Sequence, residues 1–201
     1  MPDPSSRSFA MKLSHYPKML FSSHGGWDEL RGRAPSPRRL MWKLVLPFSL
    51  LPALMICYAG LAHGRLYAPD AGMERWLAAA ALFFVAELAT VPLMAWTLQT
   101  LAASHKLAAS FKDCFLLAAG AAVPLWLSSL ALLAPDLAFN LLGALLGLAA
   151  AFALLYHGAP AMLGLEEEVE SQHFAYSALC AGAAAWALLL ALVLLPLFGG
   201  W

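Results

Sequence analysis

A single acidic side chain, Glu87, lies at the centre of an apolar segment that runs from Trp76 to Leu98. A charged carboxylate at the middle of a bilayer costs at least ~2.5 kcal/mol, so such residues are functional candidates by default. No other apolar segment offers a basic side chain at this depth, and His63 and His157 sit at segment ends, about half a bilayer or ~15 Å away. An ion pair within the chain is therefore not expected.

Two interpretations of Glu87 follow. In the first, the carboxyl is neutral and hydrogen-bonded beside the backbone that Pro92 interrupts, and its role is structural. In the second, it binds protons or cations, as intramembrane acids do in transporters. We favour the structural interpretation and keep the second open. Glu87, Pro92 and Pro124 are the candidate functional residues of the membrane interior.

The other residues that could do chemistry form no recognisable catalytic or metal-binding pattern. No two of the six histidines are spaced four residues apart on one helix, and no phosphate-binding loop, nucleophile elbow or metalloprotease motif is present. The three cysteines lie in or beside apolar segments and are expected to be small hydrophobic side chains: Cys57, Cys114 and Cys180. We therefore expect that the protein is not an enzyme and that it has no cofactor and no metal site.

The composition explains why so little chemistry is visible. Apolar residues make up 62% of the 201 positions and charged residues 12%, against roughly 25% charged in globular domains. The net charge is zero, which gives no reason to expect nucleic-acid binding. Five apolar segments are each close to the ~20 residues that cross a bilayer. They span residues 41–62, 76–98, 114–134, 137–156 and 174–198.

These segments predict an all-α, polytopic membrane protein, a bundle of five transmembrane helices. Residues 1–40 form a short amino-terminal cytoplasmic or interfacial segment, and residues 41–201 form the membrane domain. The third and fourth segments are separated by little more than Pro135 and Asp136, so they must return side by side as a hairpin. Pro47 and Pro52 each remove a hydrogen bond from the first helix, which predicts a kink or local irregularity there.

Gly143 and Gly147 form a small-residue face on the fourth segment. Small residues four positions apart let two helix backbones approach closely. We expect this face to pack against another helix of the same chain; a dimer contact is the alternative.

The segment before the first span contains His15, Tyr16 and Trp27, and Pro17 and Gly25-Gly26 interrupt any long amphipathic helix in it. We expect it to lie on the bilayer surface, with these three side chains at the interface and Trp27 at the headgroups. Docking to a partner is the alternative.

Lysines and arginines predict the orientation. Eight of the twelve occur up to Lys43, two in the first loop and two in the second. An inside amino terminus places ten of the twelve in the cytoplasm, as the positive-inside rule requires. The carboxyl terminus then lies on the opposite side.

Short motifs along the chain resemble the bacterial inner-membrane branch of the Yip (Ypt-interacting protein) domain family. They are His15-Tyr16-Pro17-Lys18-Met19-Leu20-Phe21, Gly26-Trp27, Leu46-Pro47, Leu51-Pro52, Gly120-Ala121-Ala122-Val123-Pro124-Leu125 with Ser128, Pro135, and Tyr156-His157-Gly158-Ala159-Pro160. The resemblance implies five spans in a bacterial inner membrane. In eukaryotes the family implies small-GTPase binding and vesicle trafficking, with an acidic amino-terminal motif; this segment is basic, so GTPase binding is not carried over.

The resulting hypothesis is a non-enzymatic factor for membrane organisation, assembly or a trafficking-like role, whose partners are the lipid bilayer and, through small-residue faces, other membrane proteins or a second copy. The alternative is a small transporter or permease subunit that uses Glu87. An odd number of spans without an internal repeat speaks against the transporter, because many transporters are built from paired repeats.

Overall fold

The computed structural model describes Trp27 and residues 34–164 and 168–199. The described residues form helices joined by short connections and contain no strand. Five of the helices are long and apolar enough to cross a membrane. The elements are α3 (Pro37–Leu40), the π-helical turn η3 (Met41–Val45), α4 (Leu46–Tyr67), α5 (Met73–Ser104), α6 (Phe111–Ser128), the 3-10 turn η4 (Ser129–Leu133), α7 (Leu137–Leu163) and α8 (Glu168–Phe198). The all-α, five-span prediction is confirmed.

The first span is one continuous stretch, Pro37–Tyr67, with a local irregularity where proline enters it. The Leu46 N–H donates to the carbonyl of Met41, five residues back, which makes a π-helical turn just before Pro47. Such a turn is wider than an α-helical one and occurs at sites of local disruption. The predicted irregularity is therefore present, with Pro52 buried one turn further on.

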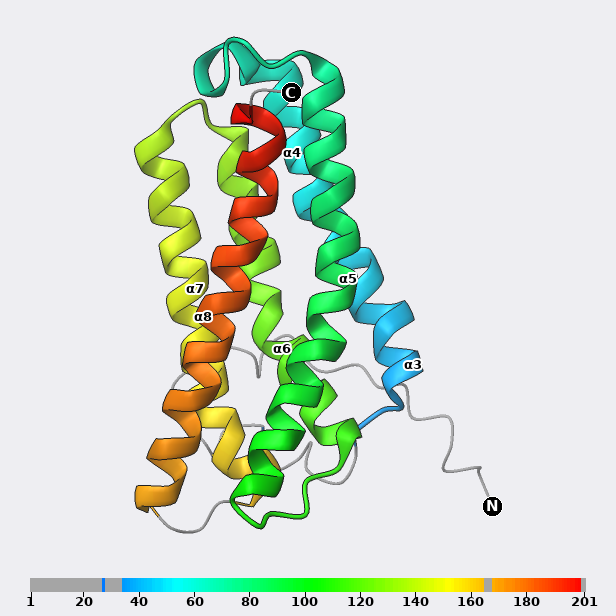
Figure 1. Ribbon diagram of the computed structural model, residues 1–201, viewed down its shortest axis with the longest axis vertical. Helices are drawn as coiled ribbons and strands as arrows, with labels where there is room; N and C mark the ends of the chain where they lie inside the picture. Colours follow the sequence, from blue (N-terminus) through cyan, green and yellow to red (C-terminus); the bar gives the residue numbers. More distant parts are fainter. Residues whose placement is uncertain (1–26, 28–33, 165–167, 200–201) are drawn as a thin grey trace, which may run out of the picture.

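The helix α6 forms the centre of the bundle. Of its most apolar stretch 44% is buried, compared with 17% for α7 and 11% for α8. It packs against α5 and α7, and α8 lies between α7 and α5 (Figure 1). The first span begins at one end of the bundle and α8 ends at the other, as an odd number of crossings requires (Figure 1).

The hairpin of α6 and α7 turns over a short, capped connection. The last turn of α6 tightens into η4, and Pro135 follows it. The side chain of Asp136 then accepts a hydrogen bond from the N–H of Phe139 at 2.7 Å and caps α7. A carboxylate at a helix amino terminus also complements the helix dipole, so this aspartate fixes where the return helix begins.

Several helices are longer than the apolar segments that predicted them. The helix α5 continues to Ser104, into the expected loop after Leu98, and α7 continues through Pro160 to Leu163 instead of ending near Tyr156. Gly164 ends α7 in the left-handed conformation, with φ of 75°, which glycine adopts without strain. The apolar segment marks the part that fits the hydrocarbon, whereas a helix ends where its cap lies.

Candidate functional site

Glu87 is buried inside the bundle, with 6% of its surface exposed. The indole N–H of Trp126 on α6 donates a hydrogen bond to its carboxyl group, and the ring of Trp126 in turn packs on Phe48 of α4 at a centroid distance of 5.8 Å. The carboxyl oxygen Oε2 has no hydrogen-bond partner among the described residues. Burial without a described cation nearby favours the uncharged carboxyl, and the single indole donor offsets this only in part.

A cavity of about 230 Å³ lies beside Glu87. Its walls come from all five spans and are mainly apolar: Pro52, Ile56, Phe83, Leu125, Ala131, Leu132, Ala144, Trp186, Leu189, Leu190 and Val193. Four further lining side chains carry polar groups: Glu87, Ser128, Ser129 and Asn140. This is the layout of a small ligand site, in which a few polar groups are set into an apolar wall.

The two serines use their protons within the helix. Ser128 Oγ donates to the carbonyl of Leu125 at 2.7 Å, and Ser129 Oγ donates to the carbonyl of Trp126 at 2.6 Å. These bonds accompany the change from α6 to the tighter turn η4 at this point. What each hydroxyl can still offer is acceptor lone pairs.

Asn140, the only asparagine of the chain, ties the return helix to α4. Its Nδ2 donates to the Tyr67 hydroxyl oxygen at 2.6 Å, and that hydroxyl donates to the carbonyl of Ala134 at 3.0 Å. Because Nδ2 also lies 3.4 Å from the same carbonyl, the amide orientation is fixed by its neighbours. The remaining oxygen, Oδ1, is buried without a partner.

The two candidate prolines lie apart from this cavity. Neither Pro92 nor Pro124 lines it, and the hydrogen-bond donor to Glu87 is Trp126, not a group released by Pro92. Pro124 instead faces α7, where its carbonyl oxygen would lie 3.0 Å from a Cβ placed on Gly147. The sequence analysis did not identify Trp126 and Asn140 as site residues, although a lone asparagine in an apolar segment is a signal that could have pointed to Asn140.

The glycine pair Gly143 and Gly147 packs inside the chain. A Cβ placed on Gly143 would lie 2.8 Å from the Cβ of Ala131, and one placed on Gly147 would lie 2.6 Å from the Cβ of Ser128. Both contacts are shorter than real Cβ atoms allow, so the backbones of α7 and the α6–η4 helix touch here because glycine permits it.

Trp27, which was expected to meet the lipid headgroups, is instead covered by the protein. It is 1% exposed and belongs to the main hydrophobic core. A Cβ placed on Gly158 of α7 would lie 2.8 Å from its ring, and one placed on Gly120 of α6 would lie 3.8 Å from it. The absence of a side chain at Gly158 leaves room for the indole, whereas the distance at Gly120 is an ordinary van der Waals contact. His15 and Tyr16 lie outside the described residues.

No group of three histidine, cysteine or acidic side chains in the described part of the chain is arranged to hold a metal ion. The cysteines Cys57, Cys114 and Cys180 are free thiols.

These features define a class: an integral, multi-pass membrane protein whose helices contact the lipid bilayer and enclose one buried acid. The family model of the Yip1 domain matches residues 18–195. The chain belongs to the Yip1 domain family. No similar curated protein and no similar solved structure was found.

Proposed function

We propose that the protein is a non-enzymatic factor that organises or assembles components of the membrane through lateral contacts of α7 and α8. The observation that carries this proposal is the small share of these two helices that the rest of the chain covers, 17% and 11% of their most apolar stretches. Their exposed large side chains are Leu137, Phe139, Leu141, Leu142, Leu145, Leu146 and Tyr156 on α7, and Tyr176, Leu188, Leu190, Leu194, Leu195 and Phe198 on α8.

A surface of this kind suits contact between helices in lipid. Association of transmembrane helices depends on close packing, since the lipid tails are as apolar as leucine. The helices α7 and α8 also lie side by side (Figure 1). Together they offer two adjacent apolar faces to a second membrane protein or to another copy of this chain.

Photo-crosslinking in native membranes tests the proposal. A photoreactive residue at Leu146 or Leu194 is expected to give adducts with proteins, because these positions are 61% and 52% exposed on α7 and α8. The same residue at Leu54 of α4 or Val85 of α5, which are also exposed, is the matched control and should give lipid adducts. Equal patterns at all four positions would contradict a dedicated contact surface.

The family resemblance and the charge distribution support a place in a bacterial inner membrane, with the amino terminus in the cytoplasm and the carboxyl terminus in the periplasm. Reporter fusions after Leu30, Ser104 and Glu170 are expected to report the cytoplasm. Fusions at Asp70 and after Trp201 are expected to report the periplasm. A cytoplasmic signal from the fusion after Trp201 would mean that one of the five helices does not cross.

A second function, a small transporter or permease subunit, is supported by one observation. Glu87 lines a cavity within the membrane and keeps one oxygen unpartnered there. Acids in such positions carry protons or ions in pumps and transporters.

Substitutions of Glu87 separate a structural from a transporting acid. Glu87→Gln keeps an acceptor for the Trp126 indole and is expected to leave thermal stability near that of the wild type, whereas Glu87→Leu strands this N–H and should cost about 1–3 kcal/mol. Thermal unfolding in detergent measures both, and Glu74→Gln at the exposed start of α5 is the control.

Proton flux in proteoliposomes, read with an entrapped pH-sensitive dye, then decides between the two functions. Normal folding of Glu87→Gln with loss of a flux that the wild type shows would favour the transporter. Absence of flux in the wild type, together with an unchanged cellular phenotype of Glu87→Gln, would leave the acid structural.

A further inference from the structure

The Glu87 cavity has unused hydrogen-bonding capacity. Two of its lining residues contain a buried oxygen without a partner: Oδ1 of Asn140, which is an acceptor, and Oε2 of Glu87, which is an acceptor when the carboxyl is ionised. The Asn140 amide nitrogen and the hydroxyls of Ser128 and Ser129 already donate within the protein. An unsatisfied buried acceptor costs free energy, so a donor-rich cation that pairs with the ionised carboxylate complements both oxygens.

We propose that this cavity binds a small primary alkylammonium ion, with its N–H groups directed to Glu87 and Asn140 and its alkyl chain against the apolar wall. An ammonium group carries three donors and no acceptor, which matches Asn140 Oδ1 and the ionised Glu87 carboxylate. Phe83 and Trp186 also line the cavity, and aromatic faces attract cations by ~0.5–2 kcal/mol.

The size and lining of the cavity select an alkylammonium over an inorganic cation. A volume of about 230 Å³ is below the roughly 300–1,000 Å³ of sites for larger ligands, so it suits a chain of a few carbon atoms. A hard metal cation needs about six oxygen ligands, whereas most of these walls are hydrocarbon. The apolar walls instead suit an alkyl chain.

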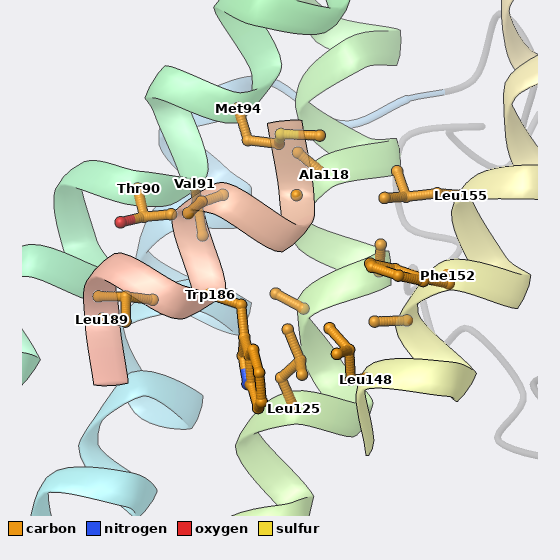
Figure 2. Close-up of a pocket in the computed structure, with 15 residues that line it drawn as sticks. Thr90, Val91, Met94, Ala118, Leu125, Leu148, Phe152, Leu155, Trp186 and Leu189 are labelled. Atoms are coloured by element: carbon orange, nitrogen blue, oxygen red, sulfur yellow. The ribbon is translucent and has the colours of Figure 1, made fainter. Parts of the chain in front are cut away.

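A neighbouring cavity, which Thr90, Val91 and Met94 help to line, does not suit a cation. It measures about 70 Å³, and Figure 2 shows apolar side chains such as Leu148 and Phe152 around it. Its polar side chain Thr90 donates to the carbonyl of Ala86 at 2.7 Å. Trp186 lines both cavities and lies beside Leu125 in Figure 2, so the ammonium group stays on the Glu87 side.

On the opposite side, a larger cavity of about 480 Å³ leads toward the end of the bundle where α7 begins. It shares three lining residues with the Glu87 cavity: Ile56, Leu132 and Val193. Asp136 lies in its wall and is exposed. A carboxylate at this end of the bundle raises the local concentration of cations there, so it favours the approach of an ammonium ion from this end.

The charges balance when the ligand is bound. Glu87 is the only ionisable side chain among the described residues that line the cavity. An ammonium ion that enters displaces the carboxyl proton to the solvent, and the resulting carboxylate and ammonium form a neutral pair. Either charge alone would be unfavourable at this depth, so the ammonium ion binds here only as a pair with the carboxylate. Binding does not require the ligand to cross the membrane, so this inference is independent of both functions proposed above.

Thermal unfolding of the full chain in nanodiscs tests this site with four probes. Butylammonium chloride is expected to raise the unfolding midpoint with a saturable dependence on concentration. 1-Butanol has the donor without the charge, tetramethylammonium has the charge without an N–H donor, and sodium has neither an N–H donor nor an alkyl chain. None of these three should raise the midpoint. An equal effect of butanol, tetramethylammonium or sodium would overturn the ammonium site.

Variants place the effect in the cavity. Glu87→Gln should weaken butylammonium binding roughly 10- to 100-fold, since it removes a charged hydrogen-bond partner. Ala144→Leu should abolish binding because the larger side chain fills the cavity. Glu74→Gln, at the exposed start of the helix that also contains Glu87, should bind like the wild type. Unchanged binding in Glu87→Gln and Ala144→Leu would refute the proposal. If one variant fails to fold, the other and the four probes on the wild type still decide.

Discussion

Replacing Trp27 by alanine is expected to lower the free energy of unfolding by about 3–5 kcal/mol, the usual range for removing a large buried aromatic side chain. The indole is 1% exposed, lies near Gly120 of α6 and fills the space that Gly158 of α7 leaves. Its loss opens a void between two central helices, one of which, α6, is the most buried of the bundle. Thermal unfolding in detergent, followed by circular dichroism, measures the change.

The matched control is Trp42→Ala, because Trp42 is a tryptophan of the first span that is 64% exposed. This variant should unfold close to the wild type. A complementary variant, Gly158→Ala, adds a methyl group only 2.8 Å from the Trp27 ring and 2.6 Å from Leu117 Cδ1, so it should displace the indole and destabilise the wild type. Equal midpoints for Trp27→Ala and Trp42→Ala would show that the indole does not occupy this slot.

The helices could be predicted from the sequence because bilayer thickness constrains each of them separately. A segment of ~20 apolar residues has to satisfy its own backbone hydrogen bonds in lipid, so its helical state does not depend on its neighbours. The same holds for the irregularity at Pro47, which follows from a missing N–H. These features need only local information.

Contacts between helices could not be predicted in this way, because they depend on the rotation and register of two segments. The sequence marks Glu87 as an acid that needs a partner, but nothing in it selects Trp126, which lies on another helix. Asn140 and Tyr67 are likewise 73 positions apart and meet only because α7 begins where α4 ends. The burial of Trp27 could not be predicted for the same reason: the preference of tryptophan for interfaces is a property of the residue, whereas the space that the indole fills is formed by two helices.

Replacing Gly147 by leucine is expected to destabilise the chain by about 1–3 kcal/mol, the usual cost of inserting side-chain atoms into a packed contact. Even the first added carbon would lie 2.6 Å from Ser128 Cβ and 3.0 Å from the backbone oxygen of Pro124. The oxygen belongs to a helix backbone and cannot turn aside, so α7 must move away from α6. The thermal midpoint in detergent should fall.

The control for this substitution is Ala149→Leu, two residues further along α7 at an exposed position, which should leave the midpoint nearly unchanged. The same pair of variants also distinguishes the internal crossing from a dimer contact. An internal crossing predicts that Gly147→Leu lowers the stability of the monomer itself, because Ser128 and Pro124 are on the same chain. Loss of dimer crosslinking with an unchanged monomer midpoint would instead assign the glycine face to a second copy, and it would require α7 to pack differently against α6.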